Sequence, residues 1–293
     1  MVSKKKILFL HQNFPGQYKH LAPELAKNKN YDVQSLSLDD DNNTTPLDIL
    51  NKTFEGIKHN KYKITDKNVP DLSRLAREFE TKMIRAESVA RRCLEMKENG
   101  YQPDLILAHP GWGEGFLLKE VWSNAKIINY FEFYYNTRDS DVDFDLKESN
   151  RPEYGFELTT KLVARNAPFL SAFNQSDLMI APTNFQKNTS PEEYKDKIRV
   201  IHDGIDTDIL KMNENASISL TPRDTNITKS QEQIILTKKD KVIAFVNRNL
   251  EPYRGYHIFM RALPDIIKKH PDAYILIIGG DGVSYGATPK KGT

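Results

Sequence analysis

The chain has one cysteine, two tryptophans and no long hydrophobic run among its 293 residues. A single cysteine, Cys93, cannot form an intramolecular disulfide, which excludes a disulfide framework and is compatible with a reducing compartment. Because Cys93 falls in a helical pattern, we expect a small core residue rather than a nucleophile. No stretch approaches the roughly 20 apolar residues of a membrane span, and the run from Ile7 to Leu10 is too short for a signal-peptide core. We therefore expect a cytoplasmic protein.

The chain also lacks an excess of charge of either sign. Its 42 Lys and Arg residues nearly balance 40 Asp and Glu residues, and the net charge is +2. This balance argues against binding to nucleic acid or to an anionic membrane surface. With 39% hydrophobic and 28% charged residues, the composition is typical of a globular protein. The length predicts two domains or one large domain.

Short apolar runs alternate with longer helical repeats over the first 200 residues. The runs are rich in β-favouring residues, and the segments between them place apolar side chains at helical spacing. We expect strands at 6–10, 31–38, 104–108, 126–131, 177–181 and 198–202, and a long helix over about 71–97. Strands that alternate with helices predict an α/β fold with a parallel sheet covered on both faces.

A second α/β pattern follows a polar stretch. Residues 213–239 are rich in Ser, Thr, Asn and Lys and show little periodicity. The next segments predict a strand at 241–246, a helix near 256–269 and a strand at 273–278. We accordingly assign 1–210 to an N-terminal domain, 211–240 to a linker or insert, and 241–293 to the start of a second domain. Two strands and one helix cannot cover a parallel sheet on both faces, so we expect this second domain to be incomplete.

Two glycine-containing turns follow strands of the first domain, at the edge where open parallel sheets bind ligands. In HQNFPGQ (11–17), Gly16 lets the backbone approach a ligand, and the helix N-terminus behind it favours a diphosphate; a simple Pro-Gly turn explains the segment equally well. In HPGWGEG (109–115), His109 lies at a strand end before exposed backbone amides, as a ligand-facing or a structural histidine. Trp112 either stacks on a sugar or base or packs in the core.

Two charged segments also follow strands. RNLEPYRG (248–255) carries Arg248 and Arg254, whose spacing suits the two phosphates of a nucleotide diphosphate; surface arginines are the alternative. The acidic string DSDVDFD (139–145) mimics the Asp-x-Asp signature by which some transferases hold a divalent metal. A metal site needs converging oxygen ligands from elsewhere, so we favour a solvated loop or an acceptor-side surface and expect no metal.

The motifs together resemble a known family. ILFLHQNFPGQY, PDLILAHPGWGEG, NYFEFYY, VDFD, APTNFQ and IRVIHDGIDTDIL, in this order, resemble the N-terminal domain of a bacterial group of family-4 glycosyltransferases. The segment from VIAFVNRNLEPYRG to LIIGGDG resembles the start of their common C-terminal domain. The resemblance implies a GT-B-like architecture with two Rossmann-like domains. It also implies metal-independent transfer of a sugar from a nucleotide diphosphate sugar to an acceptor, with retained anomeric configuration and no cofactor.

The resemblance carries roles to individual positions. Gly16 would approach the donor diphosphate, and His109 would line the pocket of the transferred sugar as the catalytic-site residue. Arg248 and Arg254 would neutralise the departing diphosphate, although Arg254 stands where a lysine is more usual and changes the contact geometry. Gly280 would lie near the donor. The implied partners are a nucleotide-sugar donor and a saccharide or lipid-linked acceptor, with at most weak peripheral membrane contact and no nucleic acid; the oligomeric state is not predicted.

One feature of the family is missing from the sequence. Its paired glutamates, seven residues apart, hold the donor ribose and sugar in the second half of the C-terminal domain, and the chain ends before them. We therefore expect a truncated donor domain and little or no hexosyl-type transferase activity from these 293 residues alone. The alternative is a non-catalytic remnant or accessory binding protein. An oxidoreductase or epimerase is disfavoured because the glycine spacing from Gly280 is one residue off the dinucleotide fingerprint.

Overall fold

The computed structural model describes residues 3–40, 45–64, 72–138, 140–142, 155–221 and 233–284. The chain forms two compact units, Met1–Gly204 (unit 1) and Ile205–Thr293 (unit 2). Each unit has its own sheet, and together they give the α/β alternation that the sequence predicts. None of the helices within the described ranges is long and apolar enough to cross a membrane.

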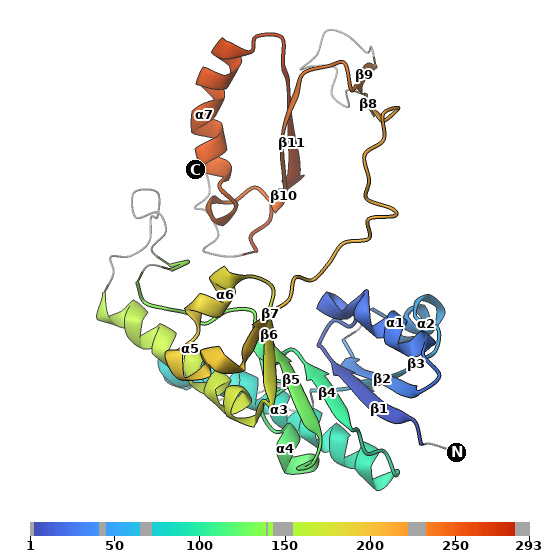
Figure 1. The fold of residues 1–293 in the computed structure, drawn as a ribbon. Coiled ribbons are helices and arrows are strands. Elements are labelled where there is room, and N and C mark those ends of the chain that lie inside the picture. The colour runs from blue at the N-terminus through green and yellow to red at the C-terminus, as the bar shows by residue number, and fades with distance from the viewer. Residues whose placement is uncertain are drawn as a thin grey trace. The chain divides into compact units, whose positions relative to one another are not determined.

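A parallel sheet organises unit 1. Within the described residues its strands are β1 (Lys5–Leu10), β2 (Tyr31–Leu38), β3 (Ile57–Tyr62), β4 (Leu105–Ala108), β5 (Lys126–Tyr130), β6 (Leu178–Ala181) and β7 (Ile198–Val200). They lie in the order β3-β2-β1-β4-β5-β6-β7 (Figure 1). The chain thus adds strands on one side of β1 and then, from β4 onward, on the other. In doubly wound sheets, the point where the order reverses is where ligands bind, at the carboxyl ends of the strands.

Helices cover both faces of this sheet because neighbouring strand residues point to opposite sides. On one face, Ile7 and Phe9 of β1 belong to the core cluster that includes residues of α1 (Leu21–Lys27) and α2 (Leu47–Thr53). On the other face, Leu8 and Leu10 belong to the cluster that includes residues of α3 (Arg74–Glu98) and α4 (Leu118–Val121). Near β6 and β7 the core is completed by α5 (Phe156–Gln175), and α6 (Asn184–Thr189) joins these two strands. Short 3-10 turns complete the connections: η1 (Gly16–Tyr18), η2 (Pro110–Trp112) and η3 (Glu192–Lys197).

The long helix predicted over 71–97 is confirmed as α3, which begins three residues later. The Ser73 hydroxyl caps its N-terminus by accepting a hydrogen bond from the Ala76 N–H at 3.4 Å. Val89, Cys93 and Met96 lie at helical spacing on the buried face. Cys93 is fully buried in this core, and burial raises the pKa of its thiol, as expected of a packing residue rather than a nucleophile.

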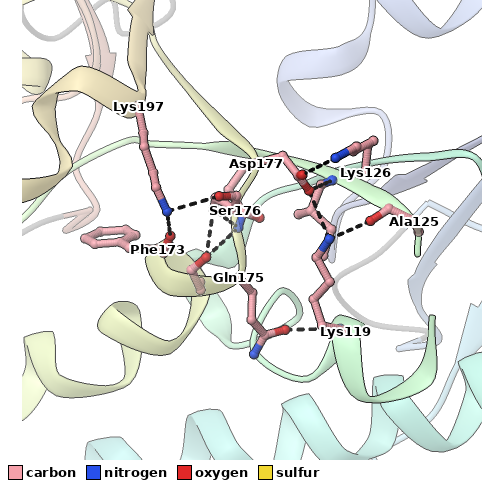
Figure 2. Close-up of polar contacts among 11 residues, drawn as sticks. Lys119, Ala125, Lys126, Phe173, Gln175, Ser176, Asp177 and Lys197 are labelled. Carbon is pink, nitrogen blue, oxygen red and sulfur yellow. Dashed lines mark hydrogen bonds and ion pairs between the residues drawn. The ribbon is translucent and has the colours of Figure 1, made fainter. Parts of the chain in front are cut away.

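A polar network ties the amino ends of β5 and β6 to α4 (Figure 2). Asp177, just before β6, accepts hydrogen bonds from Lys126 Nζ at 2.8 Å, Lys119 Nζ at 3.0 Å and the Ile127 N–H at 3.0 Å. Lys119 Nζ also donates to the Ala125 carbonyl at 2.7 Å. This network lies at the amino ends of the strands, away from the carboxyl ends where ligands bind. It therefore stabilises the fold and takes no part in the candidate site.

Unit 2 contains a strand–helix–strand element. β10 (Val242–Asn249) and β11 (Tyr274–Gly280) are parallel, and η4 (Pro252–Arg254) and α7 (Tyr256–Lys269) connect them. Phe259 of α7 packs on Phe245 of β10, with ring centroids 5.1 Å apart. The strands and helix predicted here are therefore confirmed. The polar stretch expected as a linker contains two short antiparallel strands, β8 (Ser217–Leu220) and β9 (Ile234–Thr237).

Candidate functional site

Two histidines meet at the point where the strand order of unit 1 reverses. His11 directly follows β1, and His109 directly follows β4. Because Leu10 and Ala108 are register partners, the next residues lie side by side, and the two imidazole centroids are 5.1 Å apart. The sequence motifs predict a role in the site for His109 but not for His11. The sequence did contain a signal for His11, because each of the two apolar strands is followed directly by a histidine.

The two histidines share one local geometry. The Nδ1 atom of each accepts a backbone hydrogen bond from the residue two positions ahead, His11 from Asn13 at 3.0 Å and His109 from Gly111 at 3.2 Å. An accepting Nδ1 assigns the proton of a neutral imidazole to Nε2. His11 Nε2 therefore donates to Gln17 Oε1 at 2.8 Å. Each ring is fixed by its own turn before any ligand arrives.

Glycines make room for both rings. Gly16 has a φ of +48°, and a Cβ at this position would lie 2.4 Å from His11 Nε2. A Cβ at Gly111 would lie 2.6 Å from His109 Cε1. The packing of His11 is thus sufficient to require glycine at position 16. The approach of Gly16 to a diphosphate stays a prediction.

Aromatic rings enclose His109. Its ring stacks between Trp112, at a centroid distance of 4.7 Å, and Tyr130, at 5.5 Å. The Tyr130 hydroxyl donates to Asp203 Oδ1 at 2.9 Å, which fixes the orientation of that ring. His109 is fully buried, whereas Trp112 is 37% exposed. Trp112 therefore packs on His109 and keeps part of its surface accessible, while its stacking on a sugar or base stays a prediction.

The site combines two histidines with one carboxylate. Burial, reinforced by nearby His109, lowers the pKa of His11 to about 4, so His11 is neutral at physiological pH. Glu132 Oε2 lies 3.2 Å from His109 Nε2, and the His109 side chain lowers the pKa of this carboxyl. The Glu132 side chain is 48% exposed. The carboxylate thus forms the open side of an otherwise enclosed histidine.

A pocket of about 350 Å³ lies beside this edge, between α1 and the sheet. Its floor is apolar and comes from β4, β5 and β6, and polar side chains stand at its rim. The residues that define it include Leu107, Ile128, Tyr130, Ile180, His202 and Asp203. Tyr130, which stacks on His109, and Gln17, which accepts a hydrogen bond from His11, both line the pocket.

The predicted residues of unit 2 also share one sheet edge. Arg248 lies near the carboxyl end of β10, is exposed, and has no hydrogen bond or ion pair within the described residues. Arg254 lies in η4, where its Nε is 3.4 Å from Glu251 Oε1. Gly280 ends β11 opposite Asn249. The structure thus brings together Arg248, Arg254 and Gly280, while their contact with a diphosphate stays a prediction.

The acidic string lies mostly outside the described residues. Only Ser140, Asp141 and Val142 of the 139–145 segment are described. Across the described part of the chain, no group of three or more His, Cys, Asp or Glu side chains is arranged to hold a metal ion.

The fold of the chain is similar to those of several solved enzymes. The N-terminal domain of trehalose-6-phosphate phosphatase from Candida albicans gives a TM-score of 0.56 at 14% identity, covering 96% of this chain and 65% of that one. UGT2 of Phytolacca americana, complexed with UDP-2fluoro-glucose and pterostilbene, gives 0.51 at 9%, covering 96% and 72%. The catalytic domain of starch synthase IV from Arabidopsis thaliana, bound to ADP and acarbose, gives 0.51 at 12%, covering 94% and 68%.

At such identities the likeness establishes the fold alone, and it confirms the predicted GT-B-like class with Rossmann-like units. The chain spans 62% of the length of another similar structure, a putative UDP-N-acetylglucosamine 2-epimerase from Listeria monocytogenes. No curated protein matches the sequence. Residues 35–210, more than half of the chain, match the family model described as glycosyl transferase family 4 group, and they include the His109 turn and β4 to β7. The chain therefore belongs to the glycosyl transferase family 4 group.

Proposed function

We propose that the protein transfers a hexosyl-type sugar from a nucleotide diphosphate sugar to a saccharide or lipid-linked acceptor, with retained configuration, without a metal, in the cytoplasm. One observation carries the proposal: the family match over residues 35–210 includes β4 and the buried His109 turn, which lies where the strand order of unit 1 reverses. Structures of similar fold that contain UDP-2fluoro-glucose or ADP support a nucleotide-linked donor.

In this proposal, His109 contacts the transferred sugar. Its Nδ1 accepts from the Gly111 N–H, so its Nε2 is the nitrogen that can donate a hydrogen bond to a sugar hydroxyl. The ring is enclosed in the present arrangement, so contact requires Glu132 or Trp112 to turn away from it. Glu132 is the half-exposed side chain on Nε2, and a sugar hydroxyl would take its place as the hydrogen-bond acceptor.

The arginines of unit 2 act on the leaving group. Charge develops on the diphosphate as its bond to the sugar breaks, and fixed cations at that position stabilise the transition state. Arg254 lies 3.4 Å from Glu251, and the exposed Arg248 has no ion pair with any residue that the structure describes. Gly16 and Gly280 let the backbone approach the donor at the edges of the two units.

The proposal predicts that the two arginines bind the nucleotide diphosphate. We expect an Arg248→Ala, Arg254→Ala double variant to bind UDP or GDP at least about tenfold more weakly, because each charge-assisted hydrogen bond contributes 1.5–3 kcal/mol by general magnitude. Isothermal titration calorimetry on the full chain measures this. A Lys268→Ala, Lys269→Ala variant removes two exposed cations from the end of α7 and should bind like the parent chain.

Comparison of UDP-glucose with UDP isolates the sugar contact. A His109→Gln variant, checked for folding by circular dichroism, should weaken binding of the nucleotide sugar and leave binding of the free nucleotide unchanged. For the arginine experiment, the contradicting outcome is a double variant that binds UDP and GDP as tightly as the parent chain does. That result would refute the diphosphate role of Arg248 and Arg254.

A further inference from the structure

A buried carboxylate lies in the same turn as His109. Glu114 follows η2, and its side chain is completely buried. Its Oε1 accepts a hydrogen bond from the Tyr62 hydroxyl at 2.9 Å, and its Oε2 has no hydrogen-bond partner in the described part of the chain. Burying a carboxylate costs several kcal/mol, by general magnitude, unless its partners compensate for lost water. The position of Glu114 therefore calls for an explanation other than stability.

The turn is built to hold this carboxylate against α3. Gly113 has a φ of +118°, and a Cβ there would lie 2.3 Å from the Lys82 carbonyl oxygen of α3. Only glycine permits so close an approach. The next residue in the turn, Glu114, is thereby placed beside Arg85, one helical turn after Lys82 on the same helix.

Arg85 connects the two histidine turns. Its Nη1 donates to Gln12 Oε1 at 2.6 Å and lies 3.4 Å from Glu114 Oε1. Gln12 directly follows His11, and Glu114 belongs to the turn that starts at His109. The Arg85 side chain is 15% exposed and also interacts with the Tyr62 side chain, and its hydrogen bonds to Gln12 and Glu114 both come from Nη1. Nη1 thus positions the guanidinium, whose planar fork has further N–H groups to offer another acceptor.

The charge of Arg85 is incompletely balanced. Burial raises the pKa of Glu114, and the neighbouring Arg85 opposes this effect only in part. The 3.4 Å contact is also longer than the usual 2.7–2.9 Å of a charge-assisted hydrogen bond. An anion bound at the guanidinium would complete the neutralisation. A planar guanidinium fork suits a carboxylate or a phosphate group, which present paired oxygens.

We propose that Arg85 binds a carboxylate or phosphate group of the acceptor. Gln12, Glu114 and Tyr62 are positioning residues that aim the guanidinium at the carboxyl edge. The inference rests on the proposed transferase function, which assigns the donor diphosphate to Arg248 and Arg254 of unit 2 and leaves Arg85 of unit 1 to the other substrate. The acceptor is then an anionic saccharide or a phosphate-bearing one.

Two charged monosaccharides and a neutral one test this assignment. Methyl glucuronide, glucose 6-phosphate and methyl glucoside are titrated into the full chain, and NMR follows the Nε–H resonance of Arg85. We expect one or both anionic probes to shift this resonance and the neutral probe not to. An Arg85→Gln, Glu114→Gln variant removes both charges, so it leaves no buried carboxylate unpaired, and we expect its affinity for the anion to fall at least about tenfold.

Arg92→Gln is the matched control, because Arg92 lies on the same helix and pairs with Glu95 at 2.6 Å. It should bind the probes like the parent chain. Unchanged anion affinity in the folded double variant, or no response of Arg85 to either anion, overturns the proposal. A loss of UDP affinity with unchanged probe affinity would assign Arg85 to the donor and also overturn it. UDP binding that is insensitive to Arg248 and Arg254 would refute the donor assignment while the Arg85 result stands separately.

Discussion

At the scale of the residue, His11 links the sequence to a measurable electrostatic property. It is 3% exposed, its Nδ1 and Nε2 are both engaged, and its ring lies near His109. Removing it from water disfavours the imidazolium, which is why its pKa falls to about 4. The folded protein therefore keeps this side chain neutral at a pH where the unfolded chain already binds a proton.

This difference predicts a loss of stability in mild acid. Between the ordinary pKa of 6.5 and the folded value of about 4, the unfolded state binds one more proton than the folded state, so the free energy of unfolding falls as the pH falls. We expect the parent chain to lose about 3 kcal/mol more over this window than a His11→Gln variant. Urea unfolding between pH 7.5 and 4 measures both slopes. Identical slopes would contradict the prediction.

Local sequence could predict only part of the site. His109 and Gly16 stand out because a glycine-containing turn follows an apolar run. Tyr130 and Asp203 carry no such signal, since they lie 73 positions apart in the chain. Their contact depends on β5, β6 and β7 lying side by side, and strand order is a property of the whole sheet. Chemistry visible in one turn was predictable, and chemistry assembled across strands was not.

At the scale of the element, apolar runs predicted the central strands. The edge strand β3 was not predicted, because its sequence is mostly polar. β3 reads Ile-Lys-His-Asn-Lys-Tyr, with four polar residues in the middle, and it is not among the strands that the apolar runs predict. It lies at the end of the sheet order, where β2 is the one described strand that pairs with it. An edge strand needs fewer apolar side chains than a central one, and charged side chains there discourage pairing with other chains. Tertiary position, not propensity, therefore explains this strand.

Asp177 allows the attachment of β5, β6 and α4 to be tested. Burial acts to raise the pKa of this carboxyl, but hydrogen bonds from Lys126, Ile127 and Lys119 outweigh it and lower the pKa to about 2. We expect Asp177→Asn to destabilise the protein by about 1–2 kcal/mol at pH 7, allowing for partial exposure. Because the folded pKa is depressed, the difference from the parent chain should shrink as the pH falls from 3.8 toward 2.

Asp272→Asn provides the control for this measurement. Asp272 also pairs with a lysine, Lys241 at 2.9 Å, but its side chain is 67% exposed. Solvent screens such a pair, so chemical denaturation should detect little change. An effect at Asp272 as large as that at Asp177 would show that the three hydrogen bonds of the less exposed Asp177 are not the cause.

At the scale of the whole molecule, the two units differ in how much they bury. Unit 1 contains nearly all the buried side chains of the described residues, whereas unit 2 contributes only Leu236 and Glu251 to that set. Val246 of β10 and Ile278 of β11 are 62% and 51% exposed. Since buried apolar area is the main source of stability, the two units should open at different free energies.

Hydrogen exchange measures this contrast directly. We expect the amides of β10 and β11 to exchange at least about tenfold faster than those of β1 and β4, because less buried structure opposes their opening. Mass spectrometry of peptides from each strand provides the readout on the intact chain. Equal protection in the two sheets would show that unit 2 is stabilised by something other than its own described core.

The glycine beside His11 constrains how this protein can change over time. A side chain at position 16 would collide with the imidazole, so neither position can drift freely while the other is kept. A homologue that replaces His11 with a smaller residue relieves the collision and leaves only the positive φ as a demand on position 16. The two positions should therefore vary together across the family. Asparagine, which tolerates that backbone conformation, is the residue we expect to enter at position 16 once the imidazole is gone.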